Sequence, residues 1–492
     1  MTPFPFDNSY SLFPSRFFTR TVPTLVRQPR LIRLNEPLAR ELGLDVEFLS
    51  TATGVEVLAG NRIVEGSEPI ATAYAGHQFG GFVPQLGDGR AILLGEVVDR
   101  SGMRRDIQLK GAGPTPFSRR GDGRAALGPV LREYIVSETM HALGIPTTRA
   151  LAAVLTGEKV ARETMLPGAI LTRIASSHIR VGTFEFFANK NDVEALRLLA
   201  DHVIARHYPA AALAEKPYLA LLEAVIHAQA ALIAQWLHVG FIHGVMNTDN
   251  MSIAGETIDF GPCAFMDHYV PQAVFSAIDR QGRYAYRNQP GIGEWNLTRL
   301  AECLLPILSE DSEAAVAEAE KALAAYGPAF AEAYQAGLRR KLGLHTEQEN
   351  DDALARELLA LMAANRADFT LTFRRLSDAA DHAADDSSLR SLFATDPSAF
   401  NEWLARWRTR LELEPVDGAS RAALMRSVNP AYIPRNHRVE AVIRAAEDRD
   451  DFAPFAELLT VLAHPFEDQP EWARYMEPPR EEERVLQTFC GT

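Results

Sequence analysis

The feature that most constrains this 492-residue chain is a change of hydrophobic pattern near residue 190. Before it, short runs of strand-forming residues alternate with glycine-containing turns, at 90–98, 106–110, 150–155 and 169–174. After it, apolar residues recur at helical spacing over long stretches, at 193–207, 219–238, 312–325 and 353–363. A chain that forms strands first and helices afterwards favours an α+β fold with two lobes and a cleft between them.

Composition limits the partners of the chain. Fifty basic and sixty-four acidic side chains give a formal charge of -14, which disfavours nucleic acid as a partner. Residues 1–7 lack the basic and apolar regions of a secretory signal. Polar residues interrupt the most apolar stretch, 218–245, so we expect a buried helix there and no membrane partner. Three scattered cysteines are too few for a disulfide framework or a zinc site, which favours a cytoplasmic protein.

A lysine and a glutamate in the first half of the chain are suited to hold a phosphate. Lys110 ends the second strand, and because Ile107 and Leu109 alternate with it, Lys110 can face a cleft while they enter the core. Glu133 lies in the first turns of a helix predicted over 129–143, where its carboxylate can hold the lysine ammonium in place. Taken singly, both residues could equally be ordinary solvated charges.

The clearest chemical pattern is His243-Gly-Val-Met-Asn-Thr-Asp-Asn250, followed by Ile258-Asp-Phe-Gly261. An Asn and an Asp on neighbouring loops offer the oxygen ligands that Mg²⁺ or Mn²⁺ prefers in phosphate-transfer sites. Asn and Asp are also common in tight turns, so neither residue decides the question alone. Their order after Lys110 and Glu133 favours a metal-dependent nucleotide site with Asn250 and Asp259 as the metal ligands.

Two glycine-containing loops and two arginines supply further candidates for phosphate binding. Glycines let backbone N–H groups approach a phosphate closely, and guanidinium groups suit phosphate oxygens. Such glycines usually just make turns, and surface arginines are common, so each signal is weak alone. The chain has no Walker sequence and no H-E-x-x-H motif. The candidates are Gly87, Gly89, Arg90, Asp122, Gly123, Arg173 and Arg180.

Several motifs together resemble the selenoprotein O family, and the similarity runs over nearly the whole chain. They are Gly76-His-Gln-Phe-Gly-Gly81, Gln85-Leu-Gly-Asp-Gly-Arg90, Gln108-Leu-Lys-Gly-Ala-Gly113, the 243–250 segment and Asp259-Phe-Gly-Pro262. The resemblance implies a protein-kinase-like two-lobed fold with family-specific extensions. It also implies an enzyme that binds ATP in a flipped orientation and transfers AMP to hydroxyl side chains of proteins. Bacterial members are also described as uridylylating, with UTP.

The resemblance further implies roles for single residues. Asp249 would be the proton acceptor, and Asn250 and Asp259 would hold Mg²⁺ or Mn²⁺. Glu133 would orient Lys110. The partners would be proteins modified on Ser, Thr or Tyr hydroxyls, the enzyme itself among them. The nucleotide would contact Gly87, Gly89, Arg90, Lys110, Asp122, Gly123, Arg173, Arg180 and Asp259.

The predicted catalytic loop departs from that of a kinase at one position. A kinase has its base Asp five residues before the metal-binding Asn, and that position here is Val245, which cannot accept a proton. Three functions stay open: nucleotidyl transfer to proteins, a kinase that uses Asp249 as a displaced base, and a catalytically dead nucleotide-binding scaffold. The missing base counts against the second, and the complete set of charged residues counts against the third.

The resemblance also suggests a division of the chain and a redox device. We divide it into an N-terminal extension packed on the core (1–75), a strand-rich nucleotide-binding lobe (76–190), a helical catalytic lobe with metal-binding loops (191–310) and a helical C-terminal extension with a redox-sensitive tail (311–492).

Cys490 stands third from the C-terminus, where animal members carry selenocysteine. Cys263 lies four residues after Asp259, in the segment that corresponds to a kinase activation loop. We hypothesise that these two thiols form a disulfide that restrains the tail; the alternative is that both stay reduced in the cytosol. Cys303 lies on an apolar helical face and is expected in the core.

Overall fold

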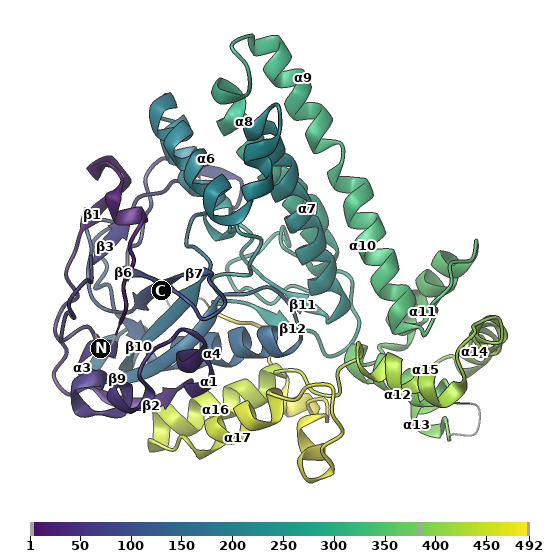
Figure 1. The fold of residues 1–492 in the computed structure, drawn as a ribbon. Helices are drawn as coiled ribbons and strands as arrows, with labels where there is room; N and C mark the ends of the chain where they lie inside the picture. The colour runs from purple at the N-terminus through teal and green to yellow at the C-terminus, as the bar shows by residue number, and fades with distance from the viewer. Residues whose placement is uncertain (1–3, 382–384, 490–492) are drawn as a thin grey trace.

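The N-terminal part of the computed structural model, which describes residues 4–381 and 385–489, is built on one antiparallel sheet (Figure 1). The strand order is β1-β3-β6-β7-β10-β9-β2. The short strand β8 lies outside this order and pairs with β10. Strands from the first 34 residues therefore form both edges of the sheet. The strands are β1 (Phe18–Arg20), β2 (Arg30–Leu34), β3 (Ile70–Thr72), β6 (Ala91–Val98), β7 (Arg104–Lys110), β8 (Ala125–Ala126), β9 (Arg149–Ala161) and β10 (Met165–Ala175).

The central hairpin, β6 and β7, confirms two of the predicted strands and ends at Lys110. Ala91 lies opposite Lys110 in the register of the pair. Ile107 and Leu109 are fully buried beneath the sheet, which is the alternation that the sequence predicts. The other two predicted strands are also confirmed, as parts of the longer strands β9 and β10.

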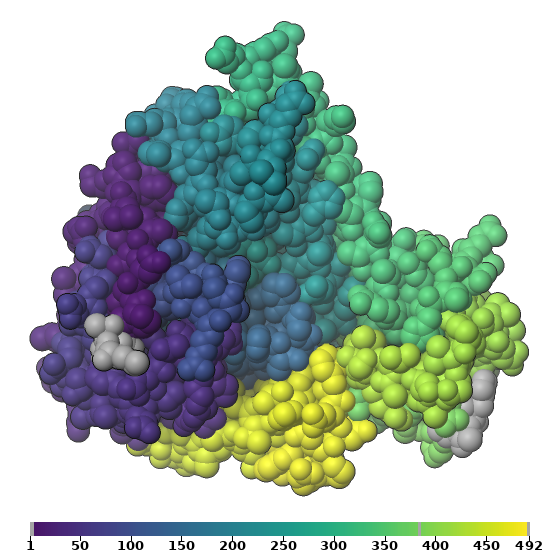
Figure 2. Space-filling model, in the orientation of Figure 1, coloured from purple at the N-terminus to yellow at the C-terminus, as the bar shows by residue number. Residues whose placement is uncertain are grey.

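Helix α4 (Leu127–Ala142) lies against β9 and β10 and confirms the predicted helix in this half of the chain. Its other side is covered by α16 (Asn436–Arg449) and α17 (Ala453–Leu462), so Leu131 and Val442 belong to one buried cluster. Figure 2 shows the C-terminal residues as a yellow band that continues from the purple N-terminal part to the green helices. The end of the chain thus completes the core around α4, which the sequence pattern did not predict.

The rest of the chain is mainly helical, and the helices predicted over 193–207, 219–238, 312–325 and 353–363 are all present. The longer helices are α5 (Val181–Ala188), α6 (Val193–His207), α7 (Pro217–His238), α8 (Gln289–Leu308), α9 (Ser312–Leu323), α10 (Tyr326–Lys341), α11 (Asp351–Asn365), α12 (Phe369–Ala379), α14 (Pro397–Leu411) and α15 (Gly418–Arg426). The helices α10, α11, α12, α14 and α15 pack around Trp403 and Trp407 in a second core, which also includes Leu237 of α7.

Short elements connect these parts. The short helices are α1 (Glu36–Glu41), α2 (Val46–Ser50), α3 (Ala52–Leu58) and α13 (Ser387–Arg390). Two small hairpins pair β4 (Gly76–Gln78) with β5 (Gly81–Val83) and β11 (Phe241–Ile242) with β12 (Ala264–Phe265). Turns of 3₁₀-helix lie at Tyr10–Leu12, Ser15–Phe17, Pro209–Leu213, Thr248–Asn250, Tyr286–Asn288, Ser391–Phe393, Pro470–Tyr475 and Glu481–Glu483.

Helix α7 is the one helix of the described chain that is long and apolar enough to cross a membrane by length and composition. Half of its most apolar window is buried inside the protein, and it packs against α8, α9 and α10. Its Gln229 is buried and donates a hydrogen bond to the carbonyl of Ser252 (2.6 Å). A buried core helix meets the same criteria of length and composition, so α7 alone is weak evidence for a membrane span.

The order of the elements confirms a mixed α+β protein with an antiparallel sheet first and a helix-rich part afterwards. The similarity to a protein kinase stays a prediction.

One buried charge in the helical part gives a stability prediction. Lys341 is buried at the end of α10, with its ammonium 4.2 Å from the centre of the Phe373 ring. Burial lowers the pKa of Lys341 from 10.5 to about 7. A lysine with a lowered pKa binds fewer protons in the folded chain than in the unfolded chain. This residue therefore makes the free energy of unfolding rise with pH between about 7 and 10.5.

We therefore expect Lys341→Met to raise the free energy of unfolding relative to the wild type. The difference should be largest below pH about 7 and should shrink toward pH 10.5. Urea unfolding at about pH 6 and about pH 9 measures it, with Lys321→Met, at an exposed position of α9, as the control. If Lys341→Met changed the free energy of unfolding by the same amount at both pH values, the lowered pKa of Lys341 would be contradicted.

Candidate active site

The segment with the clearest chemical pattern is fixed at both ends by the small hairpin of β11 and β12. Phe241 lies opposite Phe265 in that pair. Gln289 of α8 donates to the carbonyl of Phe241 (2.9 Å) and accepts from the amide of His243 (3.0 Å). Between the two strands, Asp259 has a φ of +63°, a conformation that Asp adopts more readily than most residues. The loop residues are thus held in place by a rigid frame.

The carboxylate of Asp259 lies among three cations. Its Oδ1 is 2.8 Å from Nη2 of Arg173 and 3.2 Å from Nζ of Lys110. Its Oδ2 is 3.2 Å from Nη2 of Arg180. A second carboxylate, Glu133 of α4, lies 2.6 Å from Lys110 and 2.9 Å from Arg173. We call these five residues the charge cluster; the structure brings them together from β7, α4, β10, the start of α5 and the loop after β11.

Electrostatics keep the charge cluster ionised although it is buried. Burial by itself opposes the charge on Asp259, but Arg173, Lys110 and Arg180 hold the pKa of its carboxyl well below the usual range. Glu133 shows the same balance: burial raises its pKa, and Arg173 and Lys110 lower it by more. The opposite charges of the cluster therefore offset much of the cost of burial, which a single unpaired charge would bear in full.

The arginines have unused hydrogen-bond donors. Within residues 4–381 and 385–489, Nε and Nη1 of Arg173 and Nε of Arg180 are buried and have no hydrogen-bond partner. Buried N–H groups are rarely left unpaired, because their desolvation is costly. Phosphate oxygens are the acceptors that guanidinium groups bind best, so the donors of the charge cluster fit a polyphosphate.

The first glycine loop runs directly beside Lys110. The amide of Gly111 donates to the carbonyl of Arg90 (2.7 Å), which places the end of the loop next to the charge cluster. Gly87 has a φ of +122°, and a Cβ there would lie 2.5 Å from the ring of Phe117, so no larger residue fits. Gly89 lies between them, with its carbonyl accepting from Ser118.

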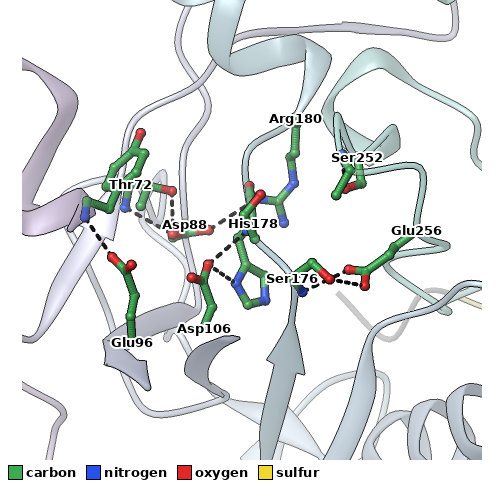
Figure 3. A network of polar contacts seen from close by, with 12 residues as sticks. Thr72, Asp88, Glu96, Asp106, Ser176, His178, Arg180, Ser252 and Glu256 are labelled. Atoms are coloured by element: carbon green, nitrogen blue, oxygen red, sulfur yellow. Dashed lines mark hydrogen bonds and ion pairs between the residues drawn. The ribbon is translucent and has the colours of Figure 1, made fainter. Parts of the chain in front are cut away.

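Asp88, inside this loop, was not among the residues that the sequence indicated. It is buried, and its Oδ2 accepts hydrogen bonds from the amide (3.0 Å) and the hydroxyl (2.6 Å) of Thr72. Its Oδ1 lies 3.7 Å from Nη1 of Arg180 (Figure 3). Asp88 therefore ties the glycine loop to β3 and to the charge cluster, and its place between two glycines was the signal that could have identified it.

The second loop is joined to the region of Lys110 through its backbone. The carbonyl of Gly123 accepts from the amide of Gly113 (3.1 Å), so the loop pairs with the chain just after Lys110. The carboxylate of Asp122 lies outside the charge cluster, with an ion pair to Arg162 (2.8 Å). The contact of Asp122 with a nucleotide stays a prediction.

Arg180 is positioned by a buried network behind it (Figure 3). Its Nη1 donates to the carbonyl of His178 (3.1 Å), and its guanidinium stacks over the ring of Tyr74 at 4.6 Å. Asp106 accepts from both the amide and Nδ1 of His178 (2.9 Å each) and is paired with Arg206 (2.6 Å). Sequence reasoning gave none of these supporting residues a role, because their importance depends on contacts between distant segments.

Asp249 lies on the 3₁₀ turn Thr248–Asn250 and is 8% exposed. Burial raises the pKa of its carboxyl to about 6, within the range of a general base near neutral pH. Its Oδ2 accepts a hydrogen bond from Nε2 of Gln78 (3.0 Å). Val245, at the position of a kinase base, is buried and contributes its carbonyl, which accepts from Nδ2 of Asn250 (3.0 Å).

The residues fit a divalent ion only together with a nucleotide. The described part of the chain contains no group of three or more His, Cys, Asp and Glu side chains that could hold a metal ion. The amide nitrogen of Asn250 is used by Val245, which leaves its oxygen as a ligand. One carboxylate, one amide oxygen and phosphate oxygens are a usual ligand set for Mg²⁺, in which Asn250 and Asp259 would be the protein's ligands.

The cysteines lie in different surroundings. Cys303 is buried in α8, as expected, and Cys263 is buried after Phe260, whose carbonyl accepts from its Sγ (3.3 Å). Cys490 lies outside the described residues. Thr488 donates its hydroxyl hydrogen to the carbonyl of Pro262 (2.5 Å) and its amide hydrogen to the carbonyl of Phe275 (2.7 Å).

A buried charge cluster with free guanidinium donors, two glycine loops and a nearby carboxylate define an enzyme that handles nucleotide phosphates. A family profile described as protein adenylyltransferase SelO matches residues 3–463. The chain belongs to this family and is a nucleotidyltransferase, which confirms the resemblance seen in the sequence.

The chain is also similar over its full length to proteins named protein nucleotidyltransferase YdiU. The relative from Rhodopseudomonas palustris (strain BisB18) is 67% identical over 489 residues. The relatives from Bradyrhizobium sp. (strain ORS 278) and Methylorubrum populi are 68% and 66% identical, and in all three cases 99% of each chain is covered.

The charge cluster gives a second stability prediction. Replacing Glu133 by Gln leaves the size of the side chain almost unchanged but removes the negative charge that Lys110 and Arg173 share. Removing one partner of a buried ion pair costs about 3 kcal/mol, so the free energy of unfolding at neutral pH should fall by roughly that amount. Denaturant unfolding measures it, and Glu332→Gln, at an exposed position of α10, should change little. An equally small change in Glu133→Gln would show that the pair contributes nothing.

Proposed function

We propose that this enzyme transfers AMP from ATP, or UMP from UTP, to Ser, Thr or Tyr hydroxyls of proteins and releases pyrophosphate. We also propose that it does so in a protein-kinase-like cleft with the nucleotide bound in a flipped orientation. The observation that carries the proposal is the pairing of a charge cluster around Asp259 with a catalytic loop whose buried carboxylate is Asp249, while Val245 stands at the position of a kinase base.

Binding of the nucleotide would rearrange the charge cluster. Lys110, Arg173 and Arg180, which contact Asp259 in the protein alone, would turn part of their donors to the β- and γ-phosphates. The glycine loop beside Arg90 and the main chain at Asp122 and Gly123 would line the rest of the nucleotide. A Mg²⁺ or Mn²⁺ ion held by Asn250 and Asp259 would neutralise the charge between neighbouring phosphate oxygens.

The transfer step needs one proton acceptor and one stabilised leaving group. The carboxylate of Asp249 accepts the proton of the substrate hydroxyl while the hydroxyl oxygen forms a bond to the α-phosphorus. The bond between the α-phosphorus and the bridging oxygen breaks, and pyrophosphate leaves with the electron pair. Its growing charge is stabilised by Lys110, Arg173 and Arg180, whose buried positions strengthen the interaction.

Isotope-labelled nucleotide tests this proposal against its alternatives. The enzyme and a protein acceptor are incubated with ATP labelled at either the α- or the γ-phosphate, and label on protein is followed. Label from the α position alone is the expected result. Label from the γ position alone would identify a kinase that uses Asp249 as its base, and label from neither would identify a nucleotide-binding scaffold.

The roles of the two aspartates can be separated from folding by substitution. Asp249→Ala removes the proton acceptor and Asp259→Ala removes a metal ligand, so each should lower the rate of AMP transfer by about 10²-fold or more. The transfer of α-label measures the rate, and thermal unfolding shows whether each variant is folded. Asp448→Ala, at an exposed position of α16, is the matched control. A folded Asp259→Ala enzyme with normal activity would remove the metal assignment.

We also propose that a disulfide between Cys263 and Cys490 restrains the tail. In support, the hydroxyl of Thr488 donates a hydrogen bond to the carbonyl of Pro262. Thr488 is two residues before Cys490 in the sequence, and Pro262 is the residue before Cys263. Oxidised glutathione would take up the two electrons and two protons of the thiols. The alternative is that both thiols stay reduced in the cytosol.

Thiol titration of the unfolded chain decides between these two states. After exposure to oxidised glutathione and removal of the reagent, the wild type should lose one pair of titratable thiols that dithiothreitol restores. Cys490→Ser should lose none under the same treatment. An unchanged thiol content in the oxidised wild type would exclude the disulfide.

A further inference from the structure

Three consecutive residues of the hairpin of β4 and β5 donate hydrogen bonds to three consecutive residues of the catalytic loop. The amide of His77 donates to Oγ1 of Thr248 (2.7 Å), Nε2 of Gln78 donates to Oδ2 of Asp249 (3.0 Å) and the amide of Phe79 donates to Oδ1 of Asn247 (3.0 Å). These partners are 168 to 171 residues apart in the sequence. The hairpin therefore has the position of a brace for the turn that carries Asp249.

Side chains on both sides make this brace rigid. Glu185 of α5 accepts from Oγ1 of Thr248 and contacts Nδ1 of His77, at 2.5 Å in both cases. On the other side, the hydroxyl of Tyr284 donates to the same Oδ1 of Asn247 (2.6 Å). The donor of Gln78 is thus held at a fixed place relative to the backbone of Asp249.

Gly76 brings the hairpin into direct contact with the carboxylate. A Cβ at this position would lie 2.5 Å from Oδ1 and 2.9 Å from Cβ of Asp249. The side chain of Asp249 therefore fits only because residue 76 has none, and its movement toward the hairpin is blocked. The tight fit and the hydrogen bond of Gln78 together restrict Asp249 to one orientation.

The two oxygens of Asp249 differ as a result. Oδ2 is occupied by Gln78, whose Nε2 must be the group that faces the carboxylate, because an ionised carboxylate only accepts hydrogen bonds. Oδ1 is buried and has no hydrogen-bond partner among the described residues. Oδ1 lies against Gly76, so the hairpin contacts both oxygens and fixes the plane of the carboxylate.

We propose that Gln78 is a positioning residue that holds Oδ2 of Asp249 and thereby fixes the orientation in which the carboxylate meets the acceptor hydroxyl. The inference rests on the proposed role of Asp249 as proton acceptor and adds the residue that orients it. Gln78 touches neither the charge cluster nor the glycine loop in the contacts of the described chain, so its effect should fall on the transfer step and leave nucleotide binding unchanged.

Two substitutions test the proposal with the full-length enzyme. Gln78→Met keeps the length of the side chain but removes the donor, and Gln78→Glu keeps the shape but places a carboxylate opposite Asp249. Misplacing a catalytic group by about 1 Å costs on the order of 10²-fold, so kcat should fall by about 10- to 100-fold in Gln78→Met. It should fall at least as far in Gln78→Glu, because the two carboxylates repel one another.

The other measurements separate positioning from a general structural effect. The KM for ATP and the affinity for a fluorescent ATP analogue should stay within about twofold of the wild type, and the melting temperature should not change. Gln348→Met, at an exposed position of the segment before α11, is the matched control. If Gln78→Met does not fold stably, the kcat of the isosteric variant Gln78→Glu tests the proposal in its place.

A second substitution locates the effect at Asp249. Gln78→Met should lower the residual rate of an Asp249→Asn enzyme by much less than it lowers the wild-type rate, because residues that act through one another are not additive. Normal kcat in both Gln78 variants, a parallel loss of nucleotide affinity, or unfolding of both variants would overturn the assignment. Transfer of α-label by the wild type in the same experiment would show that only the role of Gln78 has failed.

Discussion

The ion pairs of Asp259 with Lys110, Arg173 and Arg180 are the interaction on which the rest of the site depends. Three cations could not stay buried beside one another without carboxylates among them, and Asp259 and Glu133 supply that charge. Among the residues that the structure describes, the same arrangement leaves three guanidinium N–H groups of Arg173 and Arg180 without acceptors. The cluster is therefore stable in the protein alone and still has donors for phosphates, which is the electrostatic preorganisation that transfer of a nucleotidyl group requires.

Around this cluster the chain combines segments that are far apart in the sequence. The hairpin at residues 76–83 braces the catalytic loop near residue 249, and the C-terminal helices α16 and α17 cover α4, which carries Glu133. A helix held on both sides keeps Glu133 at a fixed distance from β7 and β10. The end of the chain thus contributes to the geometry of the site, although it contains none of the residues proposed to contact the nucleotide.

Sequence reasoning was most successful where local pattern determines the result. Alternation placed Ile107 and Leu109 in the core, and helical periodicity found α6, α7, α9 and α11 because their apolar faces repeat along the chain. It also selected Lys110, Glu133, Arg173, Arg180 and Asp259, which the fold brings into one cluster. It gave no role to Asp88, Gln78 or the network of Asp106 and His178. Each of these residues acts through a partner that is distant in the sequence, and a local pattern does not reveal such contacts. It did not predict the strands at both sheet edges, since short segments such as β1 and β2 carry little periodic signal.

The most direct test of the account is a crystal structure of the enzyme with a non-hydrolysable ATP analogue and Mn²⁺. We expect the α-phosphorus to lie next to the carboxylate of Asp249, with the metal held by Asn250, Asp259 and the phosphates. The β- and γ-phosphates should lie on Lys110, Arg173 and Arg180. A structure with the γ-phosphate beside Asp249, or with Asn250 and Asp259 turned away from the triphosphate, would contradict it.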